Sequence, residues 1–371
     1  MAKFIMVGCD LHDKTMLLKI AEGRGKALKR SYQNNPSGRK AMTAALKKRA
    51  SAAGGAKIIF AYEASGLGFG LYDELAEAGI KCYVLAPTKI AKSVKSRRSK
   101  TDEKDADAIL DILRAHVLAG NELPTVWVPD PQTRDDREVV RARLDAAQKL
   151  TGLKSQIRML LKRNGISKPS GMGKGWTNGY RVWLRVLLGD GSPLRCGARA
   201  GLGSLLRQLE FIEEEIALLD REVVALSKTP RYLRAARMMN CLKGVGVLTA
   251  MVFLTEMGDM SRFSNRRQVG AYLGLAPSIH ESGESDDRKG HITHHGNARV
   301  RKVLCQATWS RVRTDSNEKA VYERIAAKNP KHKKIAVVAA MRRLAIRLWH
   351  IGLKAQSRDV PFWEDAKPAV V

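Results

Sequence analysis

Asp102 and Asp105 lie three residues apart at the beginning of a helical pattern, directly after a run of basic residues. Residues three apart share one face of a helix, so the two carboxylates point in the same direction. Two such charges about 4 Å apart repel by about 4 kcal/mol at an effective dielectric of 20. On their own they also fit a solvated helix start, where the helix dipole favours acids. Further carboxylates from elsewhere in the fold would make a bound cation necessary.

Two more acids stand at the ends of predicted strands. Asp10 follows the apolar run 4–8, and Glu63 lies near the end of the strand pattern 57–64. A lone acid at such a position usually just faces solvent. Together with the two helical aspartates, however, these acids form a set of four from separated segments. Such a set suits divalent ions that clamp the attacking and leaving oxygens of a phosphodiester, so we predict a site for Mg²⁺ or Mn²⁺.

Strand and helix patterns alternate around these acids, which predicts an α/β domain over residues 1–125. The first two strands read as a β-hairpin, and a polar stretch that contains glycine leads from them to the first helix. The expected elements are strands at 4–8 and 15–21, a helix at 38–49, a strand at 57–64, a helix at 70–78 and a strand at 81–86.

The charge of the chain is far from balanced. Its 66 Lys and Arg against 37 Asp and Glu give a formal net charge of +29, spread over the whole length. A polyanion is the simplest partner for such a protein, because cationic side chains bind phosphate backbones by counterion release. Binding to ribosomes or to a membrane surface would give the same signal. The basic run beside the acids would hold a nucleic acid strand, or form a solvated loop: Lys92, Lys95, Arg97 and Arg98.

Cysteine usage and hydropathy point to the cytoplasm. The five cysteines are widely spaced and form no Cys-x-x-Cys pair, which is typical of buried thiols in a reducing compartment. The first residues run directly into a strand pattern and do not resemble a signal peptide. The most apolar late segment, 335–353, is interrupted by three arginines and predicts an amphipathic helix. We therefore expect no membrane partner and a cytoplasmic, nucleoid-associated protein.

The middle region, 130–232, is charged and has a helical pattern. Apolar residues recur at heptad spacing in its second half, which predicts a coiled coil or, equally well, a helical hairpin within one chain. The glycine-rich link 165–203 between the two helical runs carries aromatic residues and several arginines, and is interpreted as a nucleic-acid-contacting excursion or a loop. The heptad positions are Leu205, Leu209, Ile212, Ile216, Leu219, Val223 and Leu226.

The C-terminal region, 233–355, is followed by a tail, 356–371. Gly244 and Gly246 form a turn that opens a helix containing Thr249, and such a turn lets a backbone approach phosphate, as in helix-hairpin-helix DNA binders. Many such turns only change the direction of the chain. A basic stretch further on predicts more phosphate contacts, and a zinc site there lacks ligands at a familiar spacing. The predicted contacts are Lys289, His294, His295, Asn297, Arg299 and Arg301.

Taken together, these residues resemble the DEDD transposases of bacterial insertion sequences, the insertion-sequence one-ten family of RNA-guided recombinases. In the N-terminal part the resemblance is carried by the four acids and the Thr-Asp-x-x-Asp-Ala signature. In the C-terminal part it is carried by Gly-x-Gly-x-x-Thr-Ala, Tyr-Leu-Gly-Leu-Ala-Pro, Ser-Gly, Gly-x-Ile and Gly-Asn-x-x-x-Arg. The resemblance implies an RNase H-like, resolvase-type N-terminal domain, a coiled coil for dimerisation and a mainly helical C-terminal transposase domain.

The resemblance also implies a mechanism. Ser282, which precedes Gly283, would attack a DNA phosphodiester while the acids hold Mg²⁺, giving a covalent serine–DNA intermediate that is later religated. A serine hydroxyl needs a metal or a base to activate it. The implied partners are donor and target DNA, a structured guide RNA that selects them by base pairing, and further copies of the chain, in a homodimer and in a tetramer on DNA.

Some positions depart from the family pattern. Family members often have paired serines before Gly-Gly, so Ser278 and Ser285 are alternatives to Ser282. The basic residues usual before Gly-Asn are histidines here. Asp107 is an alternative to Asp105, but it lies off the face of Asp102. A nuclease of the Holliday-junction type that uses the acids and water, and a non-catalytic nucleic-acid-binding protein, are the competing functions.

Overall fold

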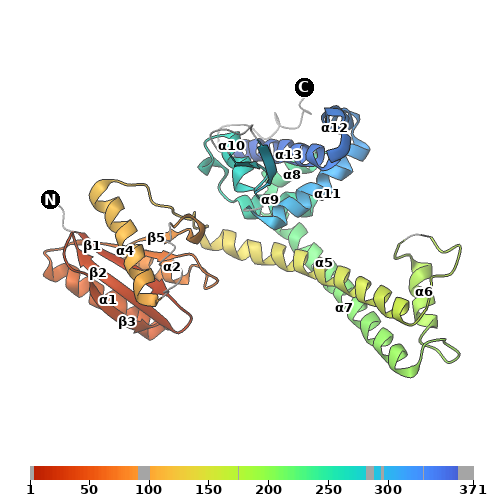
Figure 1. Cartoon of the computed structure of the whole chain (residues 1–371), viewed down its shortest axis with the longest axis horizontal. Helices are drawn as coiled ribbons and strands as arrows, with labels where there is room; N and C mark the ends of the chain where they lie inside the picture. The colour runs from red at the N-terminus through yellow and green to blue at the C-terminus, as the bar shows by residue number, and fades with distance from the viewer. Residues whose placement is uncertain are drawn as a thin grey trace. The chain divides into compact units, whose positions relative to one another are not determined.

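The structure is a computed structural model, and it describes residues 4–90, 101–173, 175–280, 288–293, 296–328 and 330–357. The chain divides into two compact units, Met1–Pro129 and Asp130–Val371 (Figure 1). The first unit contains a mixed α/β sheet and the second is mostly helical, as the sequence predicted. Each unit is described by itself.

The sheet of the first unit has five strands in the order β3-β2-β1-β4-β5. β1, β2 and β3 pair in an antiparallel manner, and β4 and β5 continue the sheet parallel to β1. The edge strand β3 was not predicted, because its sequence, Leu-Lys-Arg-Ser-Tyr-Gln, is mainly polar and its side chains are largely exposed. The strands are β1 (Phe4–Leu11), β2 (Thr15–Glu22), β3 (Leu28–Gln33), β4 (Lys57–Glu63) and β5 (Lys81–Leu85).

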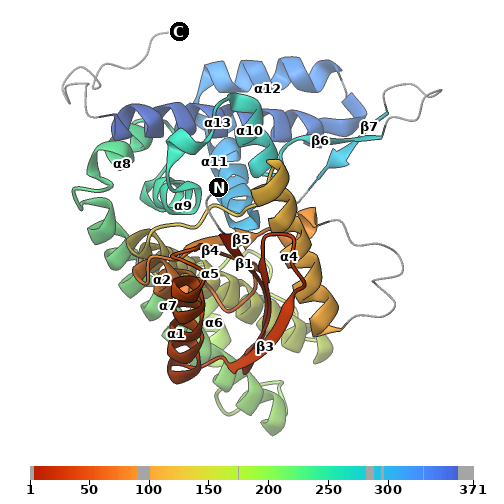
Figure 2. The same ribbon diagram turned by 90° about the vertical axis from the view of Figure 1, so that its left-hand side faces the viewer.

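Helices cover both faces of this sheet (Figure 2). One face packs against α1 (Pro36–Ala52) and α2 (Gly70–Glu77) through a core that includes Phe60 and Tyr62. The other face packs against α4 (Asp102–Ala119). A short 3₁₀-helix, η1 (Pro87–Lys89), follows β5.

Gly8 brings α4 unusually close to β1. A Cβ atom on Gly8 would lie 2.5 Å from the backbone nitrogen of Leu110 and 2.6 Å from the carbonyl oxygen of Ala106. Real Cβ atoms do not approach backbone atoms so closely. Any side chain at this position would therefore push the helix away from the sheet. The glycine is required by packing, because its backbone lies in a regular strand.

The second unit begins with two long helices, α5 (Pro131–Arg163) and α7 (Cys196–Ser227), which pack against each other within one chain. They form a helical hairpin, one of the two predicted arrangements. The predicted link 165–203 was wrong in part, because it contains α6 (Asn178–Val186) and because α7 begins at Cys196. Figure 1 shows α6 beside the end of the hairpin, where Tyr180 and Leu184 pack into a core shared with both long helices.

The remaining helices of the second unit surround α9, most of whose residues are buried. A two-stranded antiparallel sheet, β6 with β7, accompanies them. Among the residues that the structure describes, no helix is long and apolar enough to cross a membrane. The elements are α8 (Leu233–Asn240), α9 (Val247–Met257), η2 (Met260–Arg262), α10 (Arg266–Tyr272), β6 (Pro277–His280), β7 (Arg288–Ile292), α11 (Ala298–Thr314), α12 (Ser316–Lys328), η3 (Pro330–His332) and α13 (Lys333–Gln356).

We expect Gly8→Ala to destabilise the first unit by about 3 kcal/mol, the upper end of the usual cost of overpacking, because the added methyl group meets backbone atoms of α4. Chemical unfolding of the full chain, followed by circular dichroism, measures the change. Gly66→Ala is the matched control, since a Cβ there meets nothing within 4 Å. Equal stabilities of the two variants would contradict the role given to Gly8.

Candidate functional site

The parallel pairing of β1 with β4 places Asp10 and Glu63 at the same edge of the sheet. Cys9 of β1 is paired with Tyr62 of β4. The residues that follow them, Asp10 on β1 and Glu63 on β4, therefore lie side by side. Side chains alternate along a strand, so Asp10 shares its face with Gly8, the face that α4 covers. The sequence prediction that these two acids stand at strand ends is confirmed.

The first turn of α4 brings Asp102 and Asp105 to the same edge. The helix begins there because Thr101 caps it, its hydroxyl accepting a hydrogen bond from the Lys104 N–H at 3.4 Å. Burial raises the pKa of the Asp10 carboxyl, and the negative charges of Asp102 and Asp105 raise it further, whereas His12 lowers it. These acids therefore lie close enough to repel one another, which favours a cation between them.

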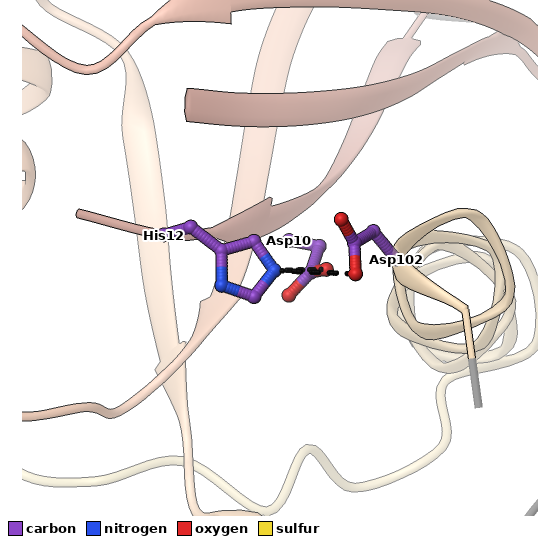
Figure 3. Close-up of side chains that lie close together, drawn as sticks. All are labelled: Asp10, His12 and Asp102. Atoms are coloured by element: carbon purple, nitrogen blue, oxygen red, sulfur yellow. Dashed lines mark hydrogen bonds and ion pairs between the residues drawn. The ribbon is translucent and has the colours of Figure 1, made fainter. Parts of the chain in front are cut away.

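His12 is the member of this site that sequence reasoning missed. Its Nε2 lies 3.0 Å from Oδ2 of Asp10 and 3.4 Å from Oδ1 of Asp102 (Figure 3). The residue follows β1 in the turn to β2, and we interpreted that segment only as a turn. Its position two residues after Asp10 was the available signal, because a tight turn can fold a side chain back onto the preceding strand end.

The residues at this edge fit a divalent metal ion. One ligand atom from each of Asp10, His12 and Asp102 lies within 4.8 Å of the others. Opposite ligands of an ion with bonds of about 2.1 Å are about 4.2 Å apart, so small side-chain movements would complete the coordination. The donor set, mainly carboxylate oxygens with one imidazole nitrogen, is compatible with Mg²⁺ and with Mn²⁺.

A second set of charges on α4 holds the helix against the sheet. The side chain of Lys19, from β2, is only 10% exposed, and its Nζ lies 2.7 Å from Oε1 of Glu103 and 3.1 Å from Oδ2 of Asp107. Lys29, from β3, contacts Oε2 of Glu103 at 2.6 Å. Hydrogen bonds from the two lysines lower the pKa of the Glu103 carboxyl to about 2. Asp107, the alternative to Asp105, is thus paired with Lys19.

Several predicted residues lie outside the described part of the chain. The predicted nucleophile and its alternative Ser285 are among them, and Ser278 and Lys289 are described only as backbone, in β6 and β7. The segment with the nucleophile, 281–287, connects these two strands in sequence. The predicted residues outside the described ranges are Ser282, Ser285, Lys92, Lys95, Arg97, Arg98, His294 and His295.

The glycine turn of the second unit connects α8 to α9. Gly244 has a positive φ of 79°, and a Cβ there would lie 3.0 Å from the Ala307 carbonyl oxygen on α11. This glycine is therefore explained by the conformation of the turn and by packing. Gly246 is the N-cap residue of α9, and open space surrounds the position of its missing Cβ. Thr249 lies in the first turn of the same helix.

Asn297 is part of a buried polar network. Its side-chain oxygen Oδ1 caps α11 and accepts hydrogen bonds from the Arg299 and Val300 N–H groups, and its side-chain Nδ2 donates to Oε2 of Glu256 at 2.8 Å. Glu256 is 3% exposed and accepts two hydrogen bonds from Arg141, at 2.7 and 3.0 Å. Burial alone would raise the pKa of the Glu256 carboxyl, but Arg141 and its other partners lower it below the ordinary value.

The two predicted arginines on α11 also contact protein groups. Arg299 lies 3.4 Å from Oδ1 of Asp145 on α5, and both side chains are substantially exposed. Arg301 donates to the carbonyl oxygens of Leu273 and Gly296, at 3.1 and 2.6 Å. Arg301 therefore helps to fix the start of α11, whereas Arg299 remains more accessible from solvent.

Comparisons with known proteins show the family of the chain. Residues 7–165 match a transposase model for the DEDD proteins of the IS110 group, and residues 236–323 match the model of the transposase IS116/IS110/IS902 family. The protein y4rJ of Sinorhizobium fredii, named as a transposase, is 30% identical over 323 residues, 82% of this chain and 80% of the relative. The chain belongs to the IS110 family of transposases.

Other relatives carry similar names. The Sinorhizobium fredii protein y4qE, also named as a transposase, is 32% identical over 256 residues, which are 68% of this transposase and 58% of the relative. The transposase for insertion sequence element IS1533 of Leptospira borgpetersenii is 23% identical over 312 residues, 83% of this chain and 86% of the relative. The DEDD transposase model matches residues 7–165, and this range contains Asp10, Glu63, Asp102 and Asp105.

We expect Lys19→Met to lower the thermal unfolding midpoint of the transposase more at pH 6 than at pH 2. The pKa of Glu103 is depressed from 4.5 to about 2 by its lysine partners. Such a carboxylate stabilises the fold above its ordinary pKa, and this stability is lost as pH falls towards the folded value. The difference between wild type and variant should therefore shrink between pH 4.5 and pH 2.

Lys57→Met is the control for this experiment, because Lys57 is an exposed residue of β4. Its difference from wild type should not change with pH in this range. If Lys19→Met lowered the midpoint equally at pH 6 and pH 2, the ion pair between Lys19 and Glu103 would not stabilise the fold. Midpoints are read from circular dichroism of the full chain.

We expect Glu256→Ala to destabilise the second unit by about 3 kcal/mol, because it removes the buried carboxylate that holds the partly buried side chains of Arg141 and Asn297. Glu214→Ala, at an exposed position of α7, should change the unfolding free energy by less than about 0.5 kcal/mol. Chemical unfolding measures both. A loss below about 1 kcal/mol for Glu256→Ala would show that the network is dispensable.

Proposed function

We propose that this transposase excises and inserts a mobile DNA element by serine attack on DNA phosphodiesters, assisted by a divalent cation. The observation that carries the proposal is the convergence of Asp10, from a strand end, with Asp102 and Asp105, from the first turn of α4, in a member of this family. The sheet order β3-β2-β1-β4-β5, with three antiparallel and two further parallel strands, supports an RNase H-like domain of the resolvase type.

The acids have a defined task in this proposal. A bound Mg²⁺ or Mn²⁺ supplies positive charge that stabilises the developing negative charge of the phosphodiester. Asp10, Asp102 and Asp105 would hold this ion, and Glu63 lies beside Asp10 at the same sheet edge. Asp10 is more sheltered than Asp102, with its side chain 17% exposed against 62%. We therefore expect the side chain of Asp10 to move less than that of Asp102 when an ion binds.

The proposed nucleophile is Ser282, on the strength of its position before Gly283 in the family pattern. Its hydroxyl oxygen attacks phosphorus, a phosphorus–oxygen bond of the DNA backbone breaks, and the released deoxyribose oxygen takes up a proton. The serine proton passes to a base or to water. Attack by a DNA hydroxyl on the phosphoserine reverses this step and restores the serine. The proposal requires Ser282 and the acids to act on one phosphodiester.

The proposed partners are donor and target DNA and a structured guide RNA. The net charge of +29 supports polyanion binding, and guidance by RNA rests on the family resemblance. A guide that pairs with DNA would reduce the need for base-specific protein contacts. Of the two predicted arginines on α11, Arg299 is the more accessible for a phosphate contact, and Gly246 offers the N-terminal amides of α9.

Self-association through the long helices is part of the proposal. Phe211 and Leu218 lie seven residues apart on α7, and they are 60% and 45% exposed. Residues at this spacing share one face of a helix, and large exposed apolar side chains are typical of protein interfaces. A homodimer through this face, and a tetramer on DNA, would cover them. Association with the nucleoid would follow from DNA binding.

We expect a covalent protein–DNA adduct when the transposase is expressed with its own flanking DNA and the reaction is stopped in denaturant. Peptide mass mapping should place the adduct on Ser282. Ser282→Ala should abolish the adduct with DNA and RNA binding retained, and Asp102→Ala should lower its yield about 100-fold or more through loss of a metal ligand.

Ser278→Ala and Ser285→Ala are the controls, and each should retain the adduct. An adduct on one of these serines would reassign the nucleophile. Cut DNA without an adduct would indicate a nuclease that uses water, and bound but uncut DNA would indicate a binding protein. Activity without divalent ions would contradict the role of the acids.

A further inference from the structure

The Nε2 atom of His12 lies against the carboxylates of Asp10 and Asp102, beside the place where a cation is expected. Figure 3 shows the ring directed at both carboxylates, with Nε2 3.0 Å from Asp10 and 3.4 Å from Asp102. The three ligand atoms come from the end of β1, from the turn that follows it and from the first turn of α4. One nitrogen therefore joins a set of oxygen donors.

The backbone of His12 is held in place from two sides. Its N–H donates to the carbonyl oxygen of Thr15 at 2.9 Å, and its own carbonyl oxygen accepts from Nδ2 of Asn34 at 2.6 Å. Asn34 in turn accepts a hydrogen bond from Nε of Arg39, on α1, at 2.8 Å. The turn is thus tied to the neighbouring strand and helix, which gives the exposed imidazole a fixed starting point beside the acids.

Imidazole nitrogen discriminates between divalent ions. Mg²⁺ is bound almost entirely by oxygen atoms and retains several waters, whereas Mn²⁺ shares the preference for oxygen but, as a first-row transition metal, also accepts an imidazole nitrogen. We propose that His12 is a direct ligand of the metal ion and makes the site prefer Mn²⁺ over Mg²⁺. This inference rests on the proposed metal site of the acids and adds the nitrogen ligand and the resulting choice of ion.

A merely structural histidine would behave differently. If His12 only donated a hydrogen bond to Asp10, its loss would change the binding of Mn²⁺ and Mg²⁺ by the same factor, because both ions would use the same oxygen atoms. If His12 is a ligand, its removal should weaken Mn²⁺ binding more than Mg²⁺ binding. A coordinated nitrogen also couples magnetically to the unpaired electrons of Mn²⁺, and electron paramagnetic resonance detects this coupling independently.

The test uses the full chain without nucleic acid and with Mn²⁺ or Mg²⁺ as the only added divalent ion. Calorimetric titration gives both affinities, and pulsed electron paramagnetic resonance of the Mn²⁺ complex detects a coordinated nitrogen. For His12→Ala we expect about a tenfold or larger loss of Mn²⁺ affinity, a clearly smaller loss for Mg²⁺, and disappearance of the nitrogen signal.

His116→Ala is the matched control. This histidine lies on α4 in the same unit, but its Nδ1 is 2.6 Å from the carbonyl oxygen of Asn121 and its Nε2 is near the hydroxyl of Tyr83. The His116→Ala variant should leave the affinities for Mn²⁺ and Mg²⁺ and the nitrogen signal unchanged. Circular dichroism verifies that both variants are folded.

Asp10→Asn separates this inference from the proposed function. If Asp10→Asn weakens the binding of both ions while His12→Ala changes neither affinity nor signal, the acids hold a metal and His12 is not a ligand. If Asp10→Asn also has no effect, the metal site itself is wrong. A nitrogen signal that persists in His12→Ala, or equal losses for the two ions, would likewise overturn the role of His12.

Discussion

The close approach of α4 to β1 at Gly8 is the constraint on which the rest of the site depends. With no side chain on Gly8, the backbone of α4 at Ala106 and Leu110 can lie directly against the strand. Asp102 precedes this contact by about one turn of helix, Asp105 is the residue next to Ala106, and Asp10 follows Gly8 on the same face of β1. The three carboxylates meet because the glycine allows the two backbones to touch. Bringing like charges together opposes folding, so the apolar contacts of Ile109, Leu110 and Leu113 with the sheet must hold the helix in place.

Charges on another part of α4 assist in this. Glu103 and Asp107, four residues apart, share a face and are neutralised by Lys19, whereas Asp102 and Asp105 are directed to Asp10. The acid-rich start of α4 therefore has two functions. The acids that contact Lys19 hold the helix against the sheet, and Asp102 and Asp105 belong to the candidate metal site. The acids that are paired with lysine gain stability by being ionised, as the low pKa of Glu103 indicates. On the other face of the segment, Asp102 lies 3.4 Å from Nε2 of His12, and its charge and that of Asp105 raise the pKa of Asp10.

The part of the site that the sequence predicted is the part defined by regular spacing. Strand ends placed Asp10 and Glu63, and helical periodicity placed Asp102 and Asp105, because both rules depend on backbone geometry alone. His12 could not be predicted in this way, since its direction depends on how one turn folds back between β1 and β2. The polar edge strand β3 and the helix α6 within a glycine-rich segment were missed for a related reason. Their stability comes from neighbours and not from their own apolar pattern: β3 pairs with the preceding strand β2, and α6 packs into the core around Ile157.

Buried arginines of the second unit change how the net charge should be interpreted. Arg137 donates to the carbonyl oxygens of Thr255 and Glu256, and Arg311, with a side chain only 4% exposed, binds the Lys243 carbonyl oxygen and Glu318. Burying such charges is tolerated because every contact is a strong, charge-assisted hydrogen bond. These arginines count towards +29, but they hold helices together and cannot also reach a phosphate. The capacity for nucleic acid is therefore smaller than the formal charge indicates, and it depends on which basic side chains the fold leaves exposed.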